Sequence, residues 1–247
     1  MAMISIIIPT YNEVDNLELL VSKIDRIFEE EDIDYEIILV DDNSPDNTAQ
    51  LAYKLSESYP VRVNVRKKDR GLSKSVVKGF EMAKGDICVV MDADLSHPAE
   101  KIPDMVRPIL ENRYDATVGS RYIPGGGFEN IPFHRKITSR IAGYMASGIT
   151  SLSDPTSGFM AIRKSIIDQI DIDPLGWKIV LEVVVKAELR IMEIPTMFSE
   201  RKKGKSKIGI KAQLEYIHQL LKLYYLKYQD KLLSAKKKNI GQDFSGH

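Results

Sequence analysis

Two carboxylates close a short apolar run in the first half of the chain. Asp92 and Asp94 stand two residues apart, directly after the apolar residues 87–91. If the chain bends there, both carboxylates can reach one ion. Mg²⁺ and Mn²⁺ prefer oxygen ligands, keep several waters and commonly bridge to substrate phosphates. The pattern therefore favours a divalent metal held jointly with a diphosphate, although it also fits acids that only cap the next helix.

Two other stretches carry groups suited to a nucleoside. Asp41 and Asp42 follow an apolar run, and their carboxylates could accept hydrogen bonds from a base or a ribose. Asp46, slightly further on, suits the cap of a following helix. Tyr11 and Glu13 combine a ring that can stack on a base with an acid that can bond its edge. Each stretch alone also fits an ordinary loop.

Basic side chains that could bind phosphate follow along the chain. Arg70 precedes a glycine, so the backbone can pass close to a ligand, and Arg121 ends another expected strand. Guanidinium groups suit bidentate binding of phosphate, although a solvated basic face fits any one of these residues equally well. The remaining candidates lie further along, at Arg135, Arg140, Arg201, Lys202, Lys203, Lys205 and Lys207.

The elements that must position these groups alternate between two periods in the first half. Short apolar runs predict buried strands, and stretches with helical spacing of apolar residues predict helices between them. Such a series is typical of a parallel sheet covered on both faces, with ligands at the carboxyl ends of the strands. The expected strands are 4–8, 36–40, 61–65 and 86–91. The loops that open at Pro9, Asp41, Lys67 and Asp92 should therefore line one crevice.

Beyond Tyr122 the alternation becomes looser. The glycine-rich residues 124–127 predict a flexible loop. Helices are expected at 134–150 and 177–189, with strands at 158–162 and 191–194.

The composition excludes several classes of protein. Acidic and basic residues balance at 35 each, so no global charge draws the chain to nucleic acid. The single cysteine, Cys88, excludes an internal disulfide and a cysteine-built zinc site. No secretory signal or run of about 20 apolar residues is visible, so a cytoplasmic location is expected.

The end of the chain has a different character. From Leu214 to Leu232, leucines and tyrosines recur on one helical face and lysines flank it. This composition suits the interface of a bilayer, and it also fits packing on the protein's own core or on a partner subunit. We expect one α/β domain over residues 1–210, an amphipathic helical tail over 211–238 and a disordered end over 239–247.

These motifs, in this order, resemble the inverting glycosyltransferases of family two, and within them the polyprenyl (dolichol) phosphate mannose synthases. The resemblance runs from about Ile4 to Gly209. It is carried by Pro-Thr-Tyr-Asn-Glu at 9–13, Val-Asp-Asp-Asn-Ser-Pro-Asp-Asn-Thr at 40–48, Arg-Gly-Leu at 70–72, Asp-Ala-Asp-Leu-Ser-His-Pro at 92–98, Gly-Ser-Arg-Tyr at 119–122, Asp-Pro-Thr-Ser-Gly-Phe at 154–159, residues 198–201 and Ser206-Lys207.

The resemblance implies a fold and a set of site residues. The fold is a single nucleotide-diphospho-sugar transferase (GT-A type) domain, a mostly parallel sheet flanked by helices, with a C-terminal amphipathic helix. Asp92, Asp94 and Arg121 would carry the catalysis, with Asp94, the side chain at Ser96 and Asp92 around the metal. The donor would be bound by Pro9, Tyr11, Glu13, Val40, Asp42, Asp92, Ala93 and Asp94, and phosphate groups by Arg121, Arg201, Lys207 and, for the acceptor, Arg135.

The implied activity is transfer of mannose from GDP-mannose to a polyprenyl (dolichyl) phosphate, dependent on Mg²⁺ or Mn²⁺, with inversion at the sugar. Such an enzyme would associate peripherally with the membrane, directly or through an integral-membrane partner subunit. The sequence departs from the family at Ser96, where some relatives carry Gln, and at Ile131, where many carry Trp. A transferase that uses a UDP-sugar such as UDP-glucose, and a non-catalytic subunit that binds a nucleotide sugar, are the alternatives.

Overall fold

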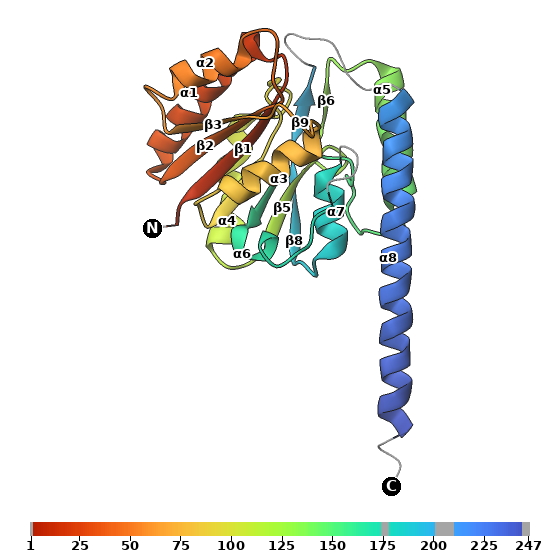
Figure 1. Ribbon diagram of the computed structural model, residues 1–247. Coiled ribbons are helices and arrows are strands. Elements are labelled where there is room, and N and C mark those ends of the chain that lie inside the picture. The colour runs from red at the N-terminus through yellow and green to blue at the C-terminus, as the bar shows by residue number, and fades with distance from the viewer. Residues whose placement is uncertain (1, 174–177, 201–209, 244–247) are drawn as a thin grey trace.

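A seven-stranded sheet forms the centre of the protein (Figure 1). The computed structural model describes residues 2–173, 178–200 and 210–243, and the side chains of 210–211 and 230–243 lie outside that description. The strands follow the order β3-β2-β1-β4-β7-β5-β8. Their bounds are β1 Ile4–Thr10, β2 Tyr35–Asp41, β3 Val61–Val65, β4 Ile87–Val90, β5 Ala116–Ser120, β7 Met160–Arg163 and β8 Ile191–Pro195.

Helices cover both faces of this sheet. Side chains alternate along each strand, so Ile6 and Ile8 pack into one core while Ile7 packs into the other. One face is covered by α1 Val14–Glu31, α2 Thr48–Leu55, the short 3₁₀ helix η1 Ala99–Lys101 and α4 Ile102–Leu110. The other is covered by α3 Leu72–Met82, α6 Lys164–Ile167 and α7 Ile179–Lys186. The expected α/β architecture of a mostly parallel sheet between helices is confirmed.

One strand runs against the others. β7 lies between β4 and β5 and is antiparallel to both, with Ala161 opposite Val89 on one side and Thr117 on the other. The expected strand at 158–162 exists, and its direction brings the preceding residues 154–159 to the same edge of the sheet as the end of β4. This placement builds the second half of the site.

A small ribbon replaces the flexible loop expected at 124–127. β6 Gly127–Glu129 pairs in parallel with β9 Met197–Ser199, so Gly127 belongs to a strand. Gly126 allows the chain to return closely past the end of β5, because a Cβ there would lie 2.3 Å from the carbonyl oxygen of Ser120. The glycines thus permit a tight turn rather than a loose loop.

Two helices stand beside this body. α5 Phe133–Ala146 ends four residues before the expected boundary, and α8 Ile210–Asp243 runs alongside it and then extends past the rest of the molecule (Figure 1). α8 continues five residues beyond the expected end of the tail at 238, and no proline stands in residues 239–243 to end it. Residues 244–247 of the expected disordered end lie outside the described residues.

α8 is attached to α5 through backbone carbonyls. The hydroxyls of Tyr216 and Tyr224 donate to the carbonyl oxygens of Ala142 and Met145, at 2.7 and 2.8 Å. Lys227 Nζ donates to the carbonyl of Ile149 at 2.8 Å. A small apolar core joins α5, α7 and α8 beneath these bonds, built from Ala146, Ile149, Leu181, Tyr216, Leu220 and Leu223. None of the helices in the described part of the chain combines the length and apolar character needed to span a bilayer.

Candidate active site

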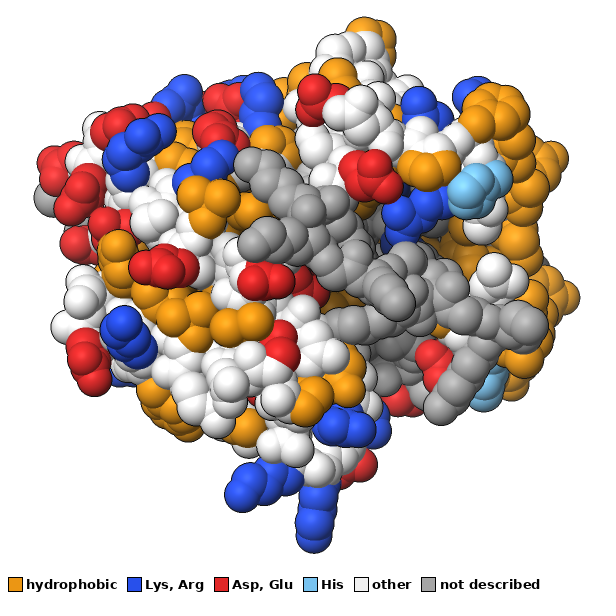
Figure 2. Space-filling model, turned by 90° about the horizontal axis from the view of Figure 1, so that it is seen from above, with side chains coloured by type: hydrophobic (Ala, Val, Ile, Leu, Met, Phe, Trp, Pro, Cys, Tyr) orange, Lys and Arg blue, Asp and Glu red, His pale blue; other side chains and the backbone are white. Residues whose placement is uncertain are grey.

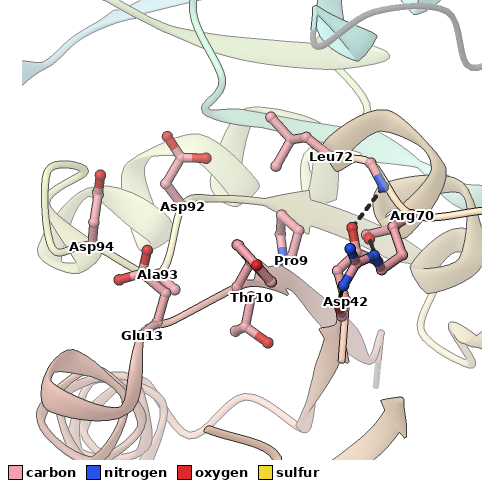
Figure 3. A pocket seen from close by; sticks show the side chains of 12 residues that line it. Pro9, Thr10, Glu13, Asp42, Arg70, Leu72, Asp92, Ala93 and Asp94 are labelled. Atoms are coloured by element: carbon pink, nitrogen blue, oxygen red, sulfur yellow. Dashed lines mark hydrogen bonds between the residues drawn. The ribbon is translucent and has the colours of Figure 1, made fainter. Parts of the chain in front are cut away.

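The carboxyl ends of β1, β2 and β4, with the start of α3, enclose a crevice of about 430 Å³ (Figure 3). The crevice expected from the loops after the first four strands is therefore confirmed, although the loop after β3 contributes Arg70 and Gly71 rather than Lys67. The lining residues are Pro9, Thr10, Tyr11, Glu13, Asp42, Arg70, Gly71, Leu72, Ser75, Asp92, Ala93 and Asp94. Seven of the residues assigned to the donor or metal from the sequence are among them.

Asp42 organises one end of the crevice. Its carboxylate accepts hydrogen bonds from Arg66 Nη1 at 2.9 Å, from Ser75 Oγ at 2.8 Å and from the backbone N–H of Gly71 at 2.6 Å. Gly71 has φ of 143°, a conformation that favours glycine. Arg70 lies over the ring of Tyr11, 5.7 Å from its centroid. The crevice wall at this end is thus formed before any ligand arrives.

The neighbouring acids shape the loop after β2. Asp41 is fully buried and accepts bonds from Thr10 Oγ1, Ser44 N and Ser44 Oγ, so it does not face the crevice. Asp46 accepts from the backbone N–H and the hydroxyl of Thr48, the first residue of α2. The N-cap position itself is occupied by Asn47 without a side-chain bond, so Asp46 does not cap the helix as expected but bonds its first N–H from one residue earlier.

Asp92 and Asp94 form the other end, with Asp92, Asp94 and Glu13 on the opposite side of the crevice from Asp42 in Figure 3. Ser96 fixes Asp94, because its hydroxyl and its backbone N–H both donate to Asp94 Oδ1, at 2.5 and 3.1 Å. Neither acid caps the following helix, since η1 and α4 begin without a side-chain cap. The structure therefore disfavours the simple capping interpretation of this motif.

His97 holds the backbone of Asp92 in place. Its Nδ1 accepts a hydrogen bond from the backbone N–H of Asp92 at 3.1 Å, and its ring stacks on Phe159 with centroids 5.1 Å apart. Burial lowers the pKa of His97. The charges of Asp92 and Asp94 act in the opposite direction but do not cancel this effect. A neutral imidazole with Nδ1 as acceptor carries its proton on Nε2, which faces Asp92 Oδ2 at 3.9 Å. His97 stands in the motif at 92–98, but nothing in the local sequence pattern indicates this supporting role.

The described residues offer two carboxylates for a metal. No group of three or more His, Cys, Asp or Glu side chains with metal-binding geometry occurs among them. Mg²⁺ and Mn²⁺ commonly take one or two carboxylates and complete their shell with waters and substrate phosphates. Asp92 and Asp94 in the wall of the crevice fit that pattern. Ser96 is 1% exposed and donates to Asp94, so a direct bond from Ser96 to a metal stays a prediction.

Arg121 lies next to this crevice in a tight ion pair. Its Nε and Nη2 donate to the two carboxylate oxygens of Asp154 at 2.5 and 2.6 Å, and Nη2 also donates to Thr156 Oγ1 at 2.7 Å. The rings of Tyr122, Phe128 and Phe198 surround the guanidinium at 5.2 to 5.6 Å. Burial would raise the pKa of Asp154, but the bonds and charge of Arg121 hold that pKa below its usual value.

The remaining assigned residues are more scattered. Val40 is fully buried in the core beneath the crevice, so its side chain makes no part of the wall. Arg135 lies in the first turn of α5. Arg201 and Lys207 lie outside the described residues. One cation that the sequence analysis did not single out, Lys178, is buried next to Thr156.

Comparisons with known proteins agree with this geometry. Residues 5–171 match the family Glycosyl transferase family 2. Three curated proteins named dolichol-phosphate mannosyltransferase are similar in sequence. The protein from Pyrococcus furiosus is 44% identical over 89% of this chain, and the chain spans only 63% of that relative's length. The proteins from Saccharomyces cerevisiae and Mycosarcoma maydis are 37% and 38% identical, each over 91% of this chain and over 88% and 80% of their own lengths.

Solved structures with the same fold are more distant in sequence. Glucosyl-3-phosphoglycerate synthase from Mycobacterium tuberculosis superposes with a TM-score of 0.64 at 16% identity, covering 92% of this chain and 80% of that one. A complex of the same enzyme with Mn²⁺, UDP-glucose and phosphoglyceric acid gives a TM-score of 0.67 over 90% and 79% of the two chains. From the crevice at the strand ends, the matched family and these relatives, we conclude that the chain belongs to glycosyltransferase family 2 and has the GT-A type fold.

Proposed function

We propose that the chain transfers mannose from GDP-mannose to a polyprenyl phosphate, with Mg²⁺ or Mn²⁺ and with inversion at the anomeric carbon. The observation that carries the proposal is the crevice itself, which has Asp42, Arg70 and Tyr11 at one end and Asp92 and Asp94 at the other. A nucleoside suits the first end and a diphosphate with its metal suits the second. The names of the three curated relatives support mannose and a dolichol-type acceptor.

The reaction places modest demands on the protein. An oxygen of the acceptor phosphate attacks the anomeric carbon, the bond from that carbon to the donor diphosphate breaks, and its electron pair leaves with GDP. A phosphate is already ionised at neutral pH, so no strong general base is needed. The chain's contribution is to orient the two substrates and to stabilise the charge that develops on the leaving group.

The residues of the crevice suit these tasks. A bound divalent cation would act as a Lewis acid, offsetting the charge on the departing diphosphate. Asp94, fixed by Ser96, and Asp92, fixed by His97, would hold that cation. Arg121 already forms an ion pair with Asp154. A phosphate that contacts Arg121 would therefore have to share its guanidinium with the Asp154 carboxylate. Arg135, Arg201 and Lys207 remain proposed contacts for phosphate groups of the donor or acceptor.

The surface of α5 and α8 supports a peripheral attachment to a membrane. Large apolar side chains lie exposed along both helices, among them Tyr144 at 81% and Leu221 at 66%. Figure 2 shows hydrophobic side chains gathered along the edge that these helices occupy in Figure 1. The exposed face consists of Phe133, Ile137, Ile141, Tyr144, Met145, Leu214, Ile217, Leu221, Tyr224, Tyr225 and Tyr228. Such a face, with tyrosines beside aliphatic residues, suits the headgroup region of a bilayer.

The tail was expected either to lie at a bilayer interface or to pack on the protein, and the two sides of α8 suit these two roles separately. Tyr216, Leu220 and Leu223 are buried against α5 and α7, whereas Leu221 and Tyr225 face away from the body. We infer that the outer side of α8, with α5, lies on the membrane that contains the lipid acceptor. An integral-membrane partner would bind the same surface.

A transfer assay tests the proposed function. The protein is incubated with radiolabelled GDP-mannose, a short polyprenyl phosphate and Mn²⁺ or Mg²⁺, and the label extracted into organic solvent is counted. UDP-glucose is run in parallel. Metal-dependent label from GDP-mannose alone is the expected result. Label from UDP-glucose instead would overturn the assignment of base and sugar, and no transfer from either would favour a binding subunit.

A further inference from the structure

A buried lysine lies behind the candidate active site. Lys178 immediately precedes α7 and is 8% exposed, although lysine is rarely buried without a partner. Its Nζ donates a hydrogen bond to the backbone carbonyl of Thr156. Burial and, to a smaller extent, the nearby charge of Arg121 lower its pKa to about 7, although the charges of Asp154 and Asp92 oppose the shift. A buried polar group needs a hydrogen-bond partner, and the carbonyl of Thr156 provides one for Lys178.

The residue that Lys178 holds is the centre of the Arg121 cluster. Thr156 Oγ1 accepts from Arg121 Nη2 at 2.7 Å and donates to Asp154 Oδ1 at 3.1 Å. Thr156 therefore touches both members of the ion pair with its hydroxyl and Lys178 with its carbonyl. If the carbonyl moves, the hydroxyl moves with it.

The same segment also borders the proposed metal site. Two residues after Thr156, Gly158 passes so close to Asp92 that a Cβ there would lie 3.7 and 3.8 Å from the two carboxylate oxygens. The next residue, Phe159, stacks on His97, which holds the backbone of Asp92. Residues 154–159 thus run from the Arg121 pair to the Asp92 support, and Lys178 is bonded to their middle.

We propose that Lys178 is a positioning residue, whose side-chain amino group holds the segment 154–159 in place and thereby orients Arg121 and the wall beside Asp92 for transfer. Lys178 does not line the crevice and its side chain is buried, so it acts through Thr156 rather than by touching a substrate. The proposal rests on the proposed function for its kinetic consequence, but its structural consequence stands apart from any activity.

The first test therefore measures backbone protection without substrates. In Lys178→Met, the amide hydrogens of residues 156–159 should exchange at least about tenfold faster than in the wild type, because their anchor is gone. Lys186→Met is the matched control. Lys186 is the last residue of α7, at the opposite end of the helix from Lys178, and it also donates to a backbone carbonyl, that of Asp171. Unchanged exchange in Lys178→Met, or the same acceleration in both variants, would overturn the proposal.

The second test uses whichever nucleotide sugar the wild type transfers. Lys178→Met should lower kcat about 30-fold while the KM of the donor changes less than about twofold, because Asp42, Arg70 and Asp94 are untouched. Lys186→Met should leave both near the wild-type values. A rise in donor KM without loss of kcat would contradict a positioning role at the transfer step. A wild type that transfers no sugar would refute the proposed function, and the exchange result would still decide the role of Lys178.

A third variant covers the case in which Lys178→Met unfolds. Thr156→Val removes the hydroxyl that joins Arg121 to Asp154 and keeps the carbonyl that Lys178 bonds. It should give the same loss of kcat with little change in donor KM. If both single variants fold, the double variant should lose far less than the product of the two losses, since both act on one pair. A wild-type kcat in Thr156→Val would overturn the route from Lys178 to Arg121.

Discussion

The two ends of the catalytic region are built in different ways. The crevice end, within residues 4–94, consists of carboxylates and a ring at the ends of parallel strands, each placed by its own βα unit. The other end, from Arg121 onward, is held by contacts between residues far apart in sequence, such as Arg121 with Asp154 and Lys178 with Thr156. It also carries the exposed apolar helices α5 and α8. The first end suits a small polar donor, and the second suits an acceptor with a lipid tail.

The crevice end is the part that proteins with this fold can share, and the end beyond Arg121 is the part in which they can differ. A nucleotide sugar can be bound by strand ends, because a parallel sheet always brings them together. A lipid phosphate arrives from a surface, so its site must join the crevice to a face that can meet that surface. Changes at the two ends should therefore have different signatures, and four changes test this.

The largest effect is expected from Asp94→Ala. Removing a proposed metal ligand should lower kcat about a thousandfold, because charge stabilisation on a leaving group contributes several kcal/mol. Thermal unfolding should stay close to that of the wild type, since the crevice wall is otherwise intact. The matched control is Asp104→Ala, which removes an exposed acid on α4 that pairs with Lys101. Near-normal turnover of Asp94→Ala would refute the metal assignment.

The next effect concerns the apolar face alone. Tyr144→Glu with Leu221→Glu should weaken binding to lipid vesicles about a hundredfold, because each buried large side chain contributes about 1.5–3 kcal/mol. Sedimentation with vesicles measures this, and GDP affinity in solution should not change. Tyr53→Glu is the control, an exposed tyrosine on α2 at the opposite end of the sheet. Equal vesicle binding by wild type and double variant would refute the membrane face.

A smaller effect should appear at the nucleoside end. Asp42→Asn keeps the size of the side chain but weakens its bonds to Arg66, Ser75 and Gly71. We expect GDP affinity to fall about tenfold by calorimetry, in line with the loss of a charged hydrogen bond. Vesicle binding should remain unchanged. Asp69→Asn, in the exposed loop before Arg70, provides a comparison that should bind GDP as the wild type does.

The smallest effect is a pH dependence of stability. Lys178 has a pKa of about 7 in the folded chain against 10.5 for an unperturbed lysine, so between these values the unfolded chain binds a proton that the folded chain does not. The free energy of unfolding therefore rises with pH across this window, and the penalty is complete below about pH 7. Lys178→Met should lose this contribution of about 2 kcal/mol, so that from pH 7 to pH 9 the wild type gains about 5 °C or more in Tm relative to the variant. An identical pH profile in both proteins would show that Lys178 stays charged.

The same contrast explains which features the sequence could predict. Asp42, Asp92 and Asp94 each follow an apolar strand, and the rule for parallel sheets brings such positions together without further information. The pairing of Arg121 with Asp154 depends on β7 running antiparallel between β4 and β5, which no local pattern reveals. The motif at 154–159 does not reveal the role of Asp154, which the structure shows holding Arg121. In the sequence Lys178 cannot be distinguished from a surface lysine, because only the structure shows that it is buried.

Ser96 and Val40 illustrate a further limit. A motif identifies a position, but whether its side chain meets a ligand or supports a neighbour depends on rotamers and packing. Ser96 turns its hydroxyl to Asp94, and Val40 fills the core. Arg201 and Lys207 stay predictions from the sequence.

The attachment of α8 to α5 has a consequence for how such proteins can change over time. Among the described residues, three side chains of α8 donate to main-chain oxygens, those of Ala142 and Met145 on α5 and of Ile149 just after it. A carbonyl is present whatever side chain the residue carries, so substitutions on α5 that preserve the helix also preserve the acceptors. The donors have no such freedom, because Tyr216, Tyr224 and Lys227 each act through a side chain. Among homologues we therefore expect the side chains of α5 to vary, so that its outer surface can adapt to different lipids. The three donor side chains on α8 should vary less.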